Sequence, residues 1–169
     1  NGTDGMLGQL VMAIADIRTL LKTIDITASL SVEALLGTDR VFQDHLHQLR
    51  PQVGQIDSAK NMSRLLAHSP LVASHTGKDD TRVQDAYSLR CAPQVAGAAR
   101  DTLAHATSVA ERELSSIIDN PVVLPSGEVS SNGNFHGAPI AHVLDFLAIS
   151  ITDVASMSER RTDRCLDEH

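Results

Sequence analysis

The stretch VQDAYSLRCAPQV, residues 83–95, holds the only tyrosine of the 169-residue chain and ends where a long apolar pattern begins. Pro93 suits the first turn of a helix, where its missing N–H costs nothing. Apolar residues then recur every three or four positions to about residue 118, at Val95, Ala99, Leu103, Ala106, Ala110, Leu114 and Ile117. The spacing predicts an amphipathic helix, and its alanines allow the close packing of a helix bundle.

Two further segments have the same helical spacing. Residues 6–36 predict one continuous helix that stops at Gly37, although the β-branched run at residues 23–27 also allows two helices with a break. Residues 139–163 predict a final helix that is apolar around most of its circumference. Such a helix is expected to be buried among others or at a subunit boundary.

Shorter elements complete the expected fold. Helices are predicted at residues 41–48 and 58–67, the second capped by Asp57 or Ser58. Pro and Gly positions predict a small hairpin at 122–129. The fold class is therefore mainly α, a bundle of long helices with one small hairpin.

Two stretches without a clear period are predicted as loops. They are residues 50–55 and the polar region 69–82. No internal repeat or linker divides residues 1–169, which we interpret as a single segment. The chain begins Asn-Gly-Thr without an initiator methionine, so we expect it to be part of a larger protein.

Composition excludes several classes of partner. The net charge of −7 without a Lys/Arg cluster argues against a nucleic-acid or anionic-membrane surface. No apolar run approaches the length of a membrane span. The cysteines, Cys91 and Cys165, fit neither a disulfide framework nor a metal site, and no signal-peptide pattern is present. We therefore expect a cytoplasmic protein without a bound metal.

Tyr87 is the first candidate for chemistry. Arg90 follows it and Gln84 precedes it, each by three residues, so a helix would place Arg90 on the same face. A phenol serves as an acid or base near neutral pH only when its pKa lies well below about 10. An arginine within reach could lower it, or could bind a carboxylate with its planar fork. Spacing alone equally fits a packed tyrosine beside a surface arginine.

Three other stretches contain residues that could bind a ligand or a partner. In residues 132–137 two glycines flank Phe135 and His136, which fits either a turn or a loop that holds an aromatic ring against a ligand. His45 and His47 are two residues apart, cannot chelate from one helix face, and are expected to be solvated. The charged residues 158–164 suit a helix end or a subunit contact.

Together these segments resemble a known family. Asn1-Gly2-Thr3, the block at residues 83–95, Asp119-Asn120-Pro121, the block at residues 133–137 and Ser158-Glu159-Arg160-Arg161 occur in the order seen in aromatic amino acid ammonia-lyases. The resemblance covers the whole chain and is strongest to histidine ammonia-lyases of the actinobacterial type.

This resemblance implies a fold and an activity. The family is built on long helices, assembles as a homotetramer, and draws each active site from three subunits. Its members eliminate ammonia from an α-amino acid, for example histidine to urocanate. The electrophile is a methylidene-imidazolone ring, formed autocatalytically from an Ala-Ser-Gly tripeptide. Residues 1–169 would then belong to the central helical core of such an enzyme.

The resemblance also assigns roles to single residues. Tyr87 matches the tyrosine implicated in the acid and base steps, and Arg90 matches the arginine that holds the substrate carboxylate. Gln84 matches a glutamine of the hydrogen-bond network, Asn1 an asparagine beside the electrophile, and Phe135 an aromatic residue that lines the site.

The chain also departs from the family pattern. It contains no Ala-Ser-Gly, so the electrophile would lie before residue 1, and a further active-site region would follow residue 169. The fragment alone is expected to be inactive. Alternatives are a phenylalanine or tyrosine ammonia-lyase, a 2,3-aminomutase, and a non-catalytic helical assembly module. The fumarase superfamily is disfavoured because its Gly-Ser-Ser-x-Met-Pro-x-Lys loop is absent.

Overall fold

The computed structural model describes residues 3–76 and 83–167, and its first element is the long helix α1 (Asp4–Ala34). The helix runs without a break through the β-branched segment, as the preferred prediction stated. Hydroxyls along this stretch donate back to carbonyls of the preceding turn, including Thr23 to Thr19 O at 3.0 Å and Ser29 to Asp25 O at 2.8 Å. These bonds satisfy the polar side chains within the helix itself.

The chain divides into two compact units. The first contains Asn1–Arg18 and Thr102–Ile149, and the second contains Thr19–Asp101 and Ser150–His169. Helices α1, α6 (Ala92–Leu114) and α7 (Ala138–Leu166) each contribute one part to each unit. Each unit has its own set of buried apolar side chains.

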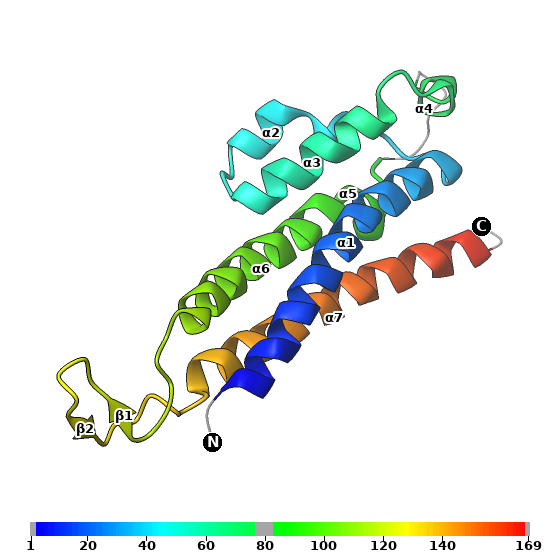
Figure 1. Ribbon diagram of the computed structural model, residues 1–169. Helices are drawn as coiled ribbons and strands as arrows, with labels where there is room; N and C mark the ends of the chain where they lie inside the picture. Colours follow the sequence, from blue (N-terminus) through cyan, green and yellow to red (C-terminus); the bar gives the residue numbers. More distant parts are fainter. Residues whose placement is uncertain (1–2, 77–82, 168–169) are drawn as a thin grey trace. The chain divides into compact units, whose positions relative to one another are not determined.

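The second unit is built around an apolar cluster. It contains the 3₁₀ turn Arg40–Phe42 and the helices α2 (Asp44–Gln48), α3 (Val53–Leu66), α4 (Pro70–Ser74) and α5 (Tyr87–Arg90). Helices α2 and α3 lie side by side (Figure 1). The buried cluster draws on five helices and the 3₁₀ turn, with the members Ala28, Val32, Phe42, Met62, Leu66, Val72, Leu89 and Ala92. Aliphatic and alanine side chains dominate this cluster, and Phe42 is its one aromatic member.

Two glycines bring α3 and α6 into close contact. A Cβ atom on Gly54 would overlap the carbonyl oxygen of Gly97, and one on Gly97 would overlap the backbone of Gln55. Gly54 N also donates to Asp101 Oδ1 at 2.9 Å. The crossing of α3 and α6 therefore depends on the absence of side chains at both positions.

A buried carboxylate joins three helices of the second unit. Asp25 in α1 is 2% exposed and accepts hydrogen bonds from Ser58 Oγ at 2.6 Å and Asn61 Nδ2 at 2.8 Å, both in α3. Arg100 in α6 forms an ion pair with the same carboxylate and donates to Leu21 O at 2.9 Å. The buried charge is thus paired and hydrogen-bonded, the condition under which burial is tolerated.

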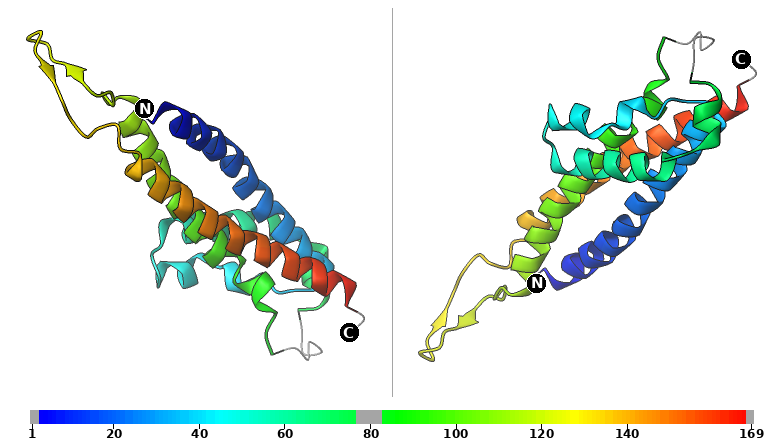
Figure 2. Two further views of the ribbon diagram at one scale, coloured as in Figure 1. Left: turned by 90° about the horizontal axis from the view of Figure 1, so that it is seen from below. Right: turned by 90° about the horizontal axis from the view of Figure 1, so that it is seen from above.

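The first unit contains the predicted hairpin. Strands β1 (Val122–Val123) and β2 (Val129–Ser130) pair antiparallel, with Val122 opposite Ser130 and Val123 opposite Val129. Gly127 adopts φ of 85° in the connecting turn, a conformation that suits glycine. The hairpin extends away from the helical parts of its unit (Figures 1 and 2). Its valines are consequently largely exposed or only half-buried.

Several predicted boundaries were wrong for identifiable reasons. Helix α3 begins at Val53, inside the predicted loop 50–55, because Asp101 of another helix accepts from the free N–H of Gly54. The short helix α4 lies within the predicted loop 69–82, where Ser69 caps it by accepting from Val72 N at 3.2 Å. Residues 77–82 of that loop lie outside the described residues.

Two more predictions differ in detail. The predicted helix 41–48 is a 3₁₀ turn and α2, separated at Gln43. Helix α6 ends at Leu114 rather than at residue 118, and the hydroxyls of Ser115 and Ser116 donate to Arg112 O. Serine hydroxyls that bond the last carbonyls compete with further helix.

Helix α7 exposes several apolar side chains within this chain. Phe146 and Ile149 are both largely exposed, whereas Ile140, Val143, Leu147 and Val154 are buried. By length and composition, α7 is the one described helix that could cross a membrane, a test that core helices of soluble proteins also pass. Asp145 and Asp153 lie within it, and carboxylates are costly at membrane depth.

The glycine crossing gives a test of the fold. Gly97→Ala should lower the free energy of unfolding by about 2 kcal/mol, because the added methyl group must displace the backbone of α3. Gly8→Ala is the matched control, since nothing lies within 4 Å of its Cβ position and alanine favours a helix. Thermal or denaturant unfolding measures both variants. Equal stability of the two would contradict the close approach of α3 and α6.

Candidate functional site

Helix α5 presents Tyr87 and Arg90 by burying the residues between them. Ser88 and Leu89 are buried, and Leu89 belongs to the apolar cluster of the second unit. Tyr87, the first residue of the helix, is 69% exposed. One face of α5 is therefore an anchor, and the other carries the phenol and the guanidinium to the surface.

Arg90 lies over the ring of Tyr87. Its Cζ atom is 4.6 Å from the ring centroid, a cation–π distance. Its Nε atom is buried and has no hydrogen-bond partner among residues 3–76 and 83–167. The stack orients the planar guanidinium, and an unoccupied N–H suits a planar acceptor such as a carboxylate. The two residues that spacing placed on one face are thus in contact.

The segment before α5 is tied to the turn that follows α1. Thr38 N donates to Asp85 Oδ2 at 2.7 Å, and the carbonyl oxygen of Gly37 lies 2.9 Å from His75 Nε2. A Cβ atom at Gly37 would lie only 3.2 Å from the same Asp85 oxygen. Glycine at this position therefore lets Asp85 approach. The predicted network residue Gln84 directly precedes Asp85 and is exposed.

Arg161 of α7 binds the backbone of α5. This side chain of α7 is 3% exposed, and its Nη1 donates to Ser88 O at 3.3 Å. Burial lowers the pKa of Arg161 from its usual value. Neighbouring Arg160 is exposed and pairs with Glu159. The sequence pattern predicted the same role, a charge at a helix end, for both arginines. Only the burial of Arg161 in the folded chain distinguishes them.

A second group of polar residues surrounds Phe135 in the first unit. Asn120 Oδ1 accepts from Asn132 N at 2.8 Å, and Asn134 Nδ2 donates to Ile117 O at 3.3 Å. These bonds fasten the loop at residues 132–137 to the segment after α6. Phe135 itself is 40% exposed. The loop is thus a fixed support for the ring.

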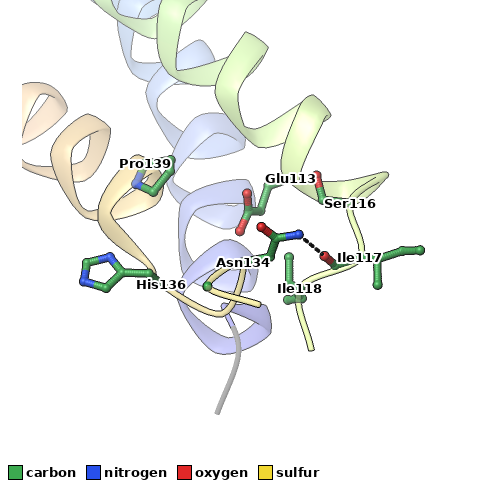
Figure 3. Close-up of a pocket in the computed structure, with 8 residues that line it drawn as sticks. Glu113, Ser116, Ile117, Ile118, Asn134, His136 and Pro139 are labelled. Carbon is green, nitrogen blue, oxygen red and sulfur yellow. Dashed lines mark hydrogen bonds between the residues drawn. The ribbon is translucent and has the colours of Figure 1, made fainter. Parts of the chain in front are cut away.

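A pocket of about 660 Å³ adjoins this loop. Figure 3 shows Glu113 and Asn134 side by side in the view, with the His136 ring directed away from them. The lining combines polar and apolar groups, namely Glu113, Ser116, Ile117, Ile118, Gly133, Asn134, His136 and Pro139. A cavity of this size and mixed lining suits a small organic molecule.

The predicted site residues fall into separate groups. Gln84, Tyr87 and Arg90 lie in the second unit, and Phe135 lies in the first. Asn1 is outside the described residues, while Thr3 of the same Asn-Gly-Thr segment is fully buried. Among the described residues, no group of three or more His, Cys, Asp and Glu side chains could hold a metal ion.

His47 corrects one sequence expectation. It was predicted to be solvated but is 2% exposed. Its Nε2 lies 3.0 Å from Val41 O, and its Nδ1 lies 3.0 Å from Gln55 Nε2. Nε2 is placed to donate to the Val41 carbonyl, and Nδ1 is placed to accept from the Gln55 amide. Local spacing could not reveal these partners because Gln55 lies in another helix.

The whole chain matches one known protein family. The profile of the aromatic amino acid lyase family matches residues 1–169. Histidine ammonia-lyase of Streptomyces coelicolor is 64% identical over all 169 residues, and that of Streptomyces griseus is 66% identical. In both cases the match covers 100% of this chain and 33% of the relative. The chain therefore spans about a third of the length of these relatives.

Solved structures agree with the sequence comparison. Tyrosine aminomutase from Streptomyces globisporus superposes with a TM-score of 0.89 at 37% identity, covering 100% of this chain and 35% of that one. Histidine ammonia-lyase from Trypanosoma cruzi gives a TM-score of 0.85 at 34% identity, covering 99% and 30%. The long-helix fold is thus the one that these enzymes share. Because the family profile matches all of residues 1–169 and the identity to its members is this high, the chain belongs to the aromatic amino acid lyase family.

Proposed function

We propose that the protein carrying this chain is a carbon–nitrogen lyase that eliminates ammonia from L-histidine to give urocanate. The observation that carries the proposal is the identity of 64–66% to histidine ammonia-lyases of Streptomyces over the whole chain. Identity to the aminomutases of known structure is lower, at 32–38%. The substrate is accordingly assigned to histidine and the outcome to elimination.

A 2,3-aminomutase is the second candidate. It is favoured by the TM-score of 0.90 to phenylalanine aminomutase of Pantoea agglomerans at 32% identity. Phenylalanine ammonia-lyase from yeast shares this fold as well, with a TM-score of 0.86 at 27% identity. The residues that choose among these substrates are not identified by Tyr87, Arg90 or Phe135, which fit any amino acid with an aromatic side chain.

The arrangement around α5 suits one half of an elimination site. In the reaction a C–H bond at the β-carbon and the C–N bond at the α-carbon break, a C=C bond forms, and ammonia leaves. Arg90 would bind the substrate carboxylate and fix the β-carbon, while the Tyr87 hydroxyl would hold or transfer a proton. Gln84, Asn1 and Phe135 would complete the contacts to the substrate. Exposure of Tyr87 and the free N–H of Arg90 are consistent with these roles.

The family's methylidene-imidazolone is the proposed cofactor. When present, this group supplies the electrophile that activates the departing amino group. The chain lacks Ala-Ser-Gly, so its own residues cannot form the ring. They do fit a place beside it, since an exposed phenol and a partly unsatisfied guanidinium stand together on one rigid helix. No metal is part of the proposal.

The proposed assembly is a homotetramer in the cytoplasm. Its partners are the remainder of the same polypeptide, further copies of the chain and a small amino acid, with no nucleic acid and no membrane. Exposed apolar side chains on α7, including Phe146 and Ile149, and on the hairpin, including Val123 and Val129, suit subunit contacts. A non-catalytic assembly module would use the same surfaces, and activity separates the two.

The activity assay is the first test. The full-length protein should convert L-histidine to urocanate, followed by ultraviolet absorbance, with phenylalanine and tyrosine as comparison substrates. Formation of a β-amino acid from any of them would identify an aminomutase instead. Absence of both product types in correctly assembled protein would favour the non-catalytic module.

Tyr87→Phe removes only the hydroxyl from the candidate acid–base residue. We expect turnover to fall by about a hundredfold or more, as for the loss of a general acid or base. The ring still accepts the Arg90 stack, so the oligomeric state and melting temperature should match those of the unchanged protein. Normal turnover in this variant would refute the role given to Tyr87.

Arg90→Lys keeps the positive charge and loses the planar fork. The KM for histidine should rise by about tenfold, since roughly one charged hydrogen bond to the carboxylate is lost. Arg160→Lys is the matched control, because Arg160 is exposed and pairs with Glu159 on α7. Steady-state kinetics measure KM for both variants. An equal KM in the two would contradict carboxylate binding by Arg90.

A further inference from the structure

Glu113 and Thr3 form a partly buried hydrogen bond within the first unit. Thr3 Oγ1 donates to Glu113 Oε1 at 2.5 Å, across 110 residues of sequence. Thr3 is fully buried and precedes α1, whose first residue is Asp4, while Glu113 lies in the last turn of α6. Hydrogen bonds to a carboxylate are stronger than those between neutral groups. The link therefore fixes the beginning of α1 against the end of α6.

The helix dipoles indicate which of the two helices the Glu113 carboxylate stabilises. A negative charge in the last turn of α6 is unfavourable for that helix, because the C-terminal carbonyls are already negative. The same charge is favourable near the first turn of α1, where unpaired N–H groups make the end positive. The charge of Glu113 therefore destabilises the C-terminus of α6 and stabilises the N-terminus of α1.

Glu113 also lines the pocket beside the Phe135 loop. Asn134 and His136, the neighbours of Phe135, line the same pocket. The loop approaches α1 closely as well, since a Cβ atom at Gly137 would lie 2.8 Å from Met6 Sδ and 3.7 Å from Thr3 Cγ2. Three segments therefore meet around one carboxylate: the start of α1, the end of α6 and the Phe135 loop (Figure 3).

We propose that Glu113 is a positioning residue of the lyase site, which acts through the Thr3 hydroxyl to set the beginning of α1 against the Phe135 loop. The inference rests on the proposed function. Gly137, whose Cβ position lies 3.7 Å from Thr3 Cγ2, is two residues from Phe135, so a shift of Thr3 would reach the Phe135 loop. Glu113 itself contacts neither the substrate nor the reacting atoms.

The test uses the full-length protein and a double-mutant cycle. Thr3→Val replaces the hydroxyl by a methyl group of similar size, and Thr3→Ser retains the hydroxyl. Glu113→Ala removes the acceptor, and Glu113→Gln retains an oxygen at the same position. Glu111→Gln is the matched control, because Glu111 is exposed on the same helix and does not line the pocket.

We expect Thr3→Val and Glu113→Ala each to lower kcat by about tenfold or more, the equivalent of one charged hydrogen bond. KM should change less than kcat, because the carboxylate-binding arginine lies elsewhere. The double variant should be no worse than either single variant, since both remove the same link. Thr3→Ser and Glu113→Gln should recover most of kcat. Because kcat is referred to the concentration of folded enzyme, a loss of stability that only reduces the amount of folded protein would leave kcat unchanged.

The outcomes separate the inference from the proposed function. The inference alone would be overturned if the unchanged enzyme is active and Thr3→Val lowers kcat no more than Glu111→Gln does. Additive losses in the double variant would overturn it as well, because independent effects need no link between the residues. Failure of the unchanged enzyme to produce urocanate or another unsaturated acid would overturn the proposed function and, with it, the inference.

Discussion

The buried carboxylate of Asp25 is the constraint on which the second unit depends. A charge that is 2% exposed must find its partners inside the protein, and it finds them on α3 and α6. These bonds fix the register of both helices relative to α1, because a shift by one turn would leave the charge unpaired. The Gly54 and Gly97 contact then sets how closely α3 and α6 approach.

The candidate site depends on the packing of the second unit, because this packing holds α5 in place. The helix has only four residues and could not hold its shape alone. Three anchors hold it: Asp85 bonded to the turn after α1, Leu89 in the apolar cluster, and Ser88 O bonded to Arg161 of α7. A phenol and a guanidinium on so short a helix are therefore placed by buried residues around them. The chemistry-bearing groups can be exposed because their neighbours are not.

Much of the fold could be predicted because the signals were local and periodic. The three long helices and the hairpin follow from apolar spacing and from Pro and Gly positions. Boundaries failed where a distant residue decided them, as when Asp101 captures the N–H of Gly54 and so starts α3 five residues early. His47 failed for the same reason, since Gln55 and Val41 supply its partners after the chain folds. For the short α4, Ser69 and Pro70 were a usable capping signal that the polar composition obscured.

Some residues of the candidate site could be predicted from the sequence, whereas the residues that support them could not. Spacing placed Tyr87 and Arg90 on one face, and the stack at 4.6 Å agrees. Spacing could not distinguish buried Arg161 from exposed Arg160 or single out Glu113, because the contacts of Arg161 and Glu113 are made with segments distant in the sequence. Tyr87 and Phe135 remain 69% and 40% exposed, and water at such positions would weaken every electrostatic contact to a bound amino acid. Elimination chemistry at these residues therefore requires further protein surface to cover them, which the proposed tetramer and the remainder of the polypeptide would supply.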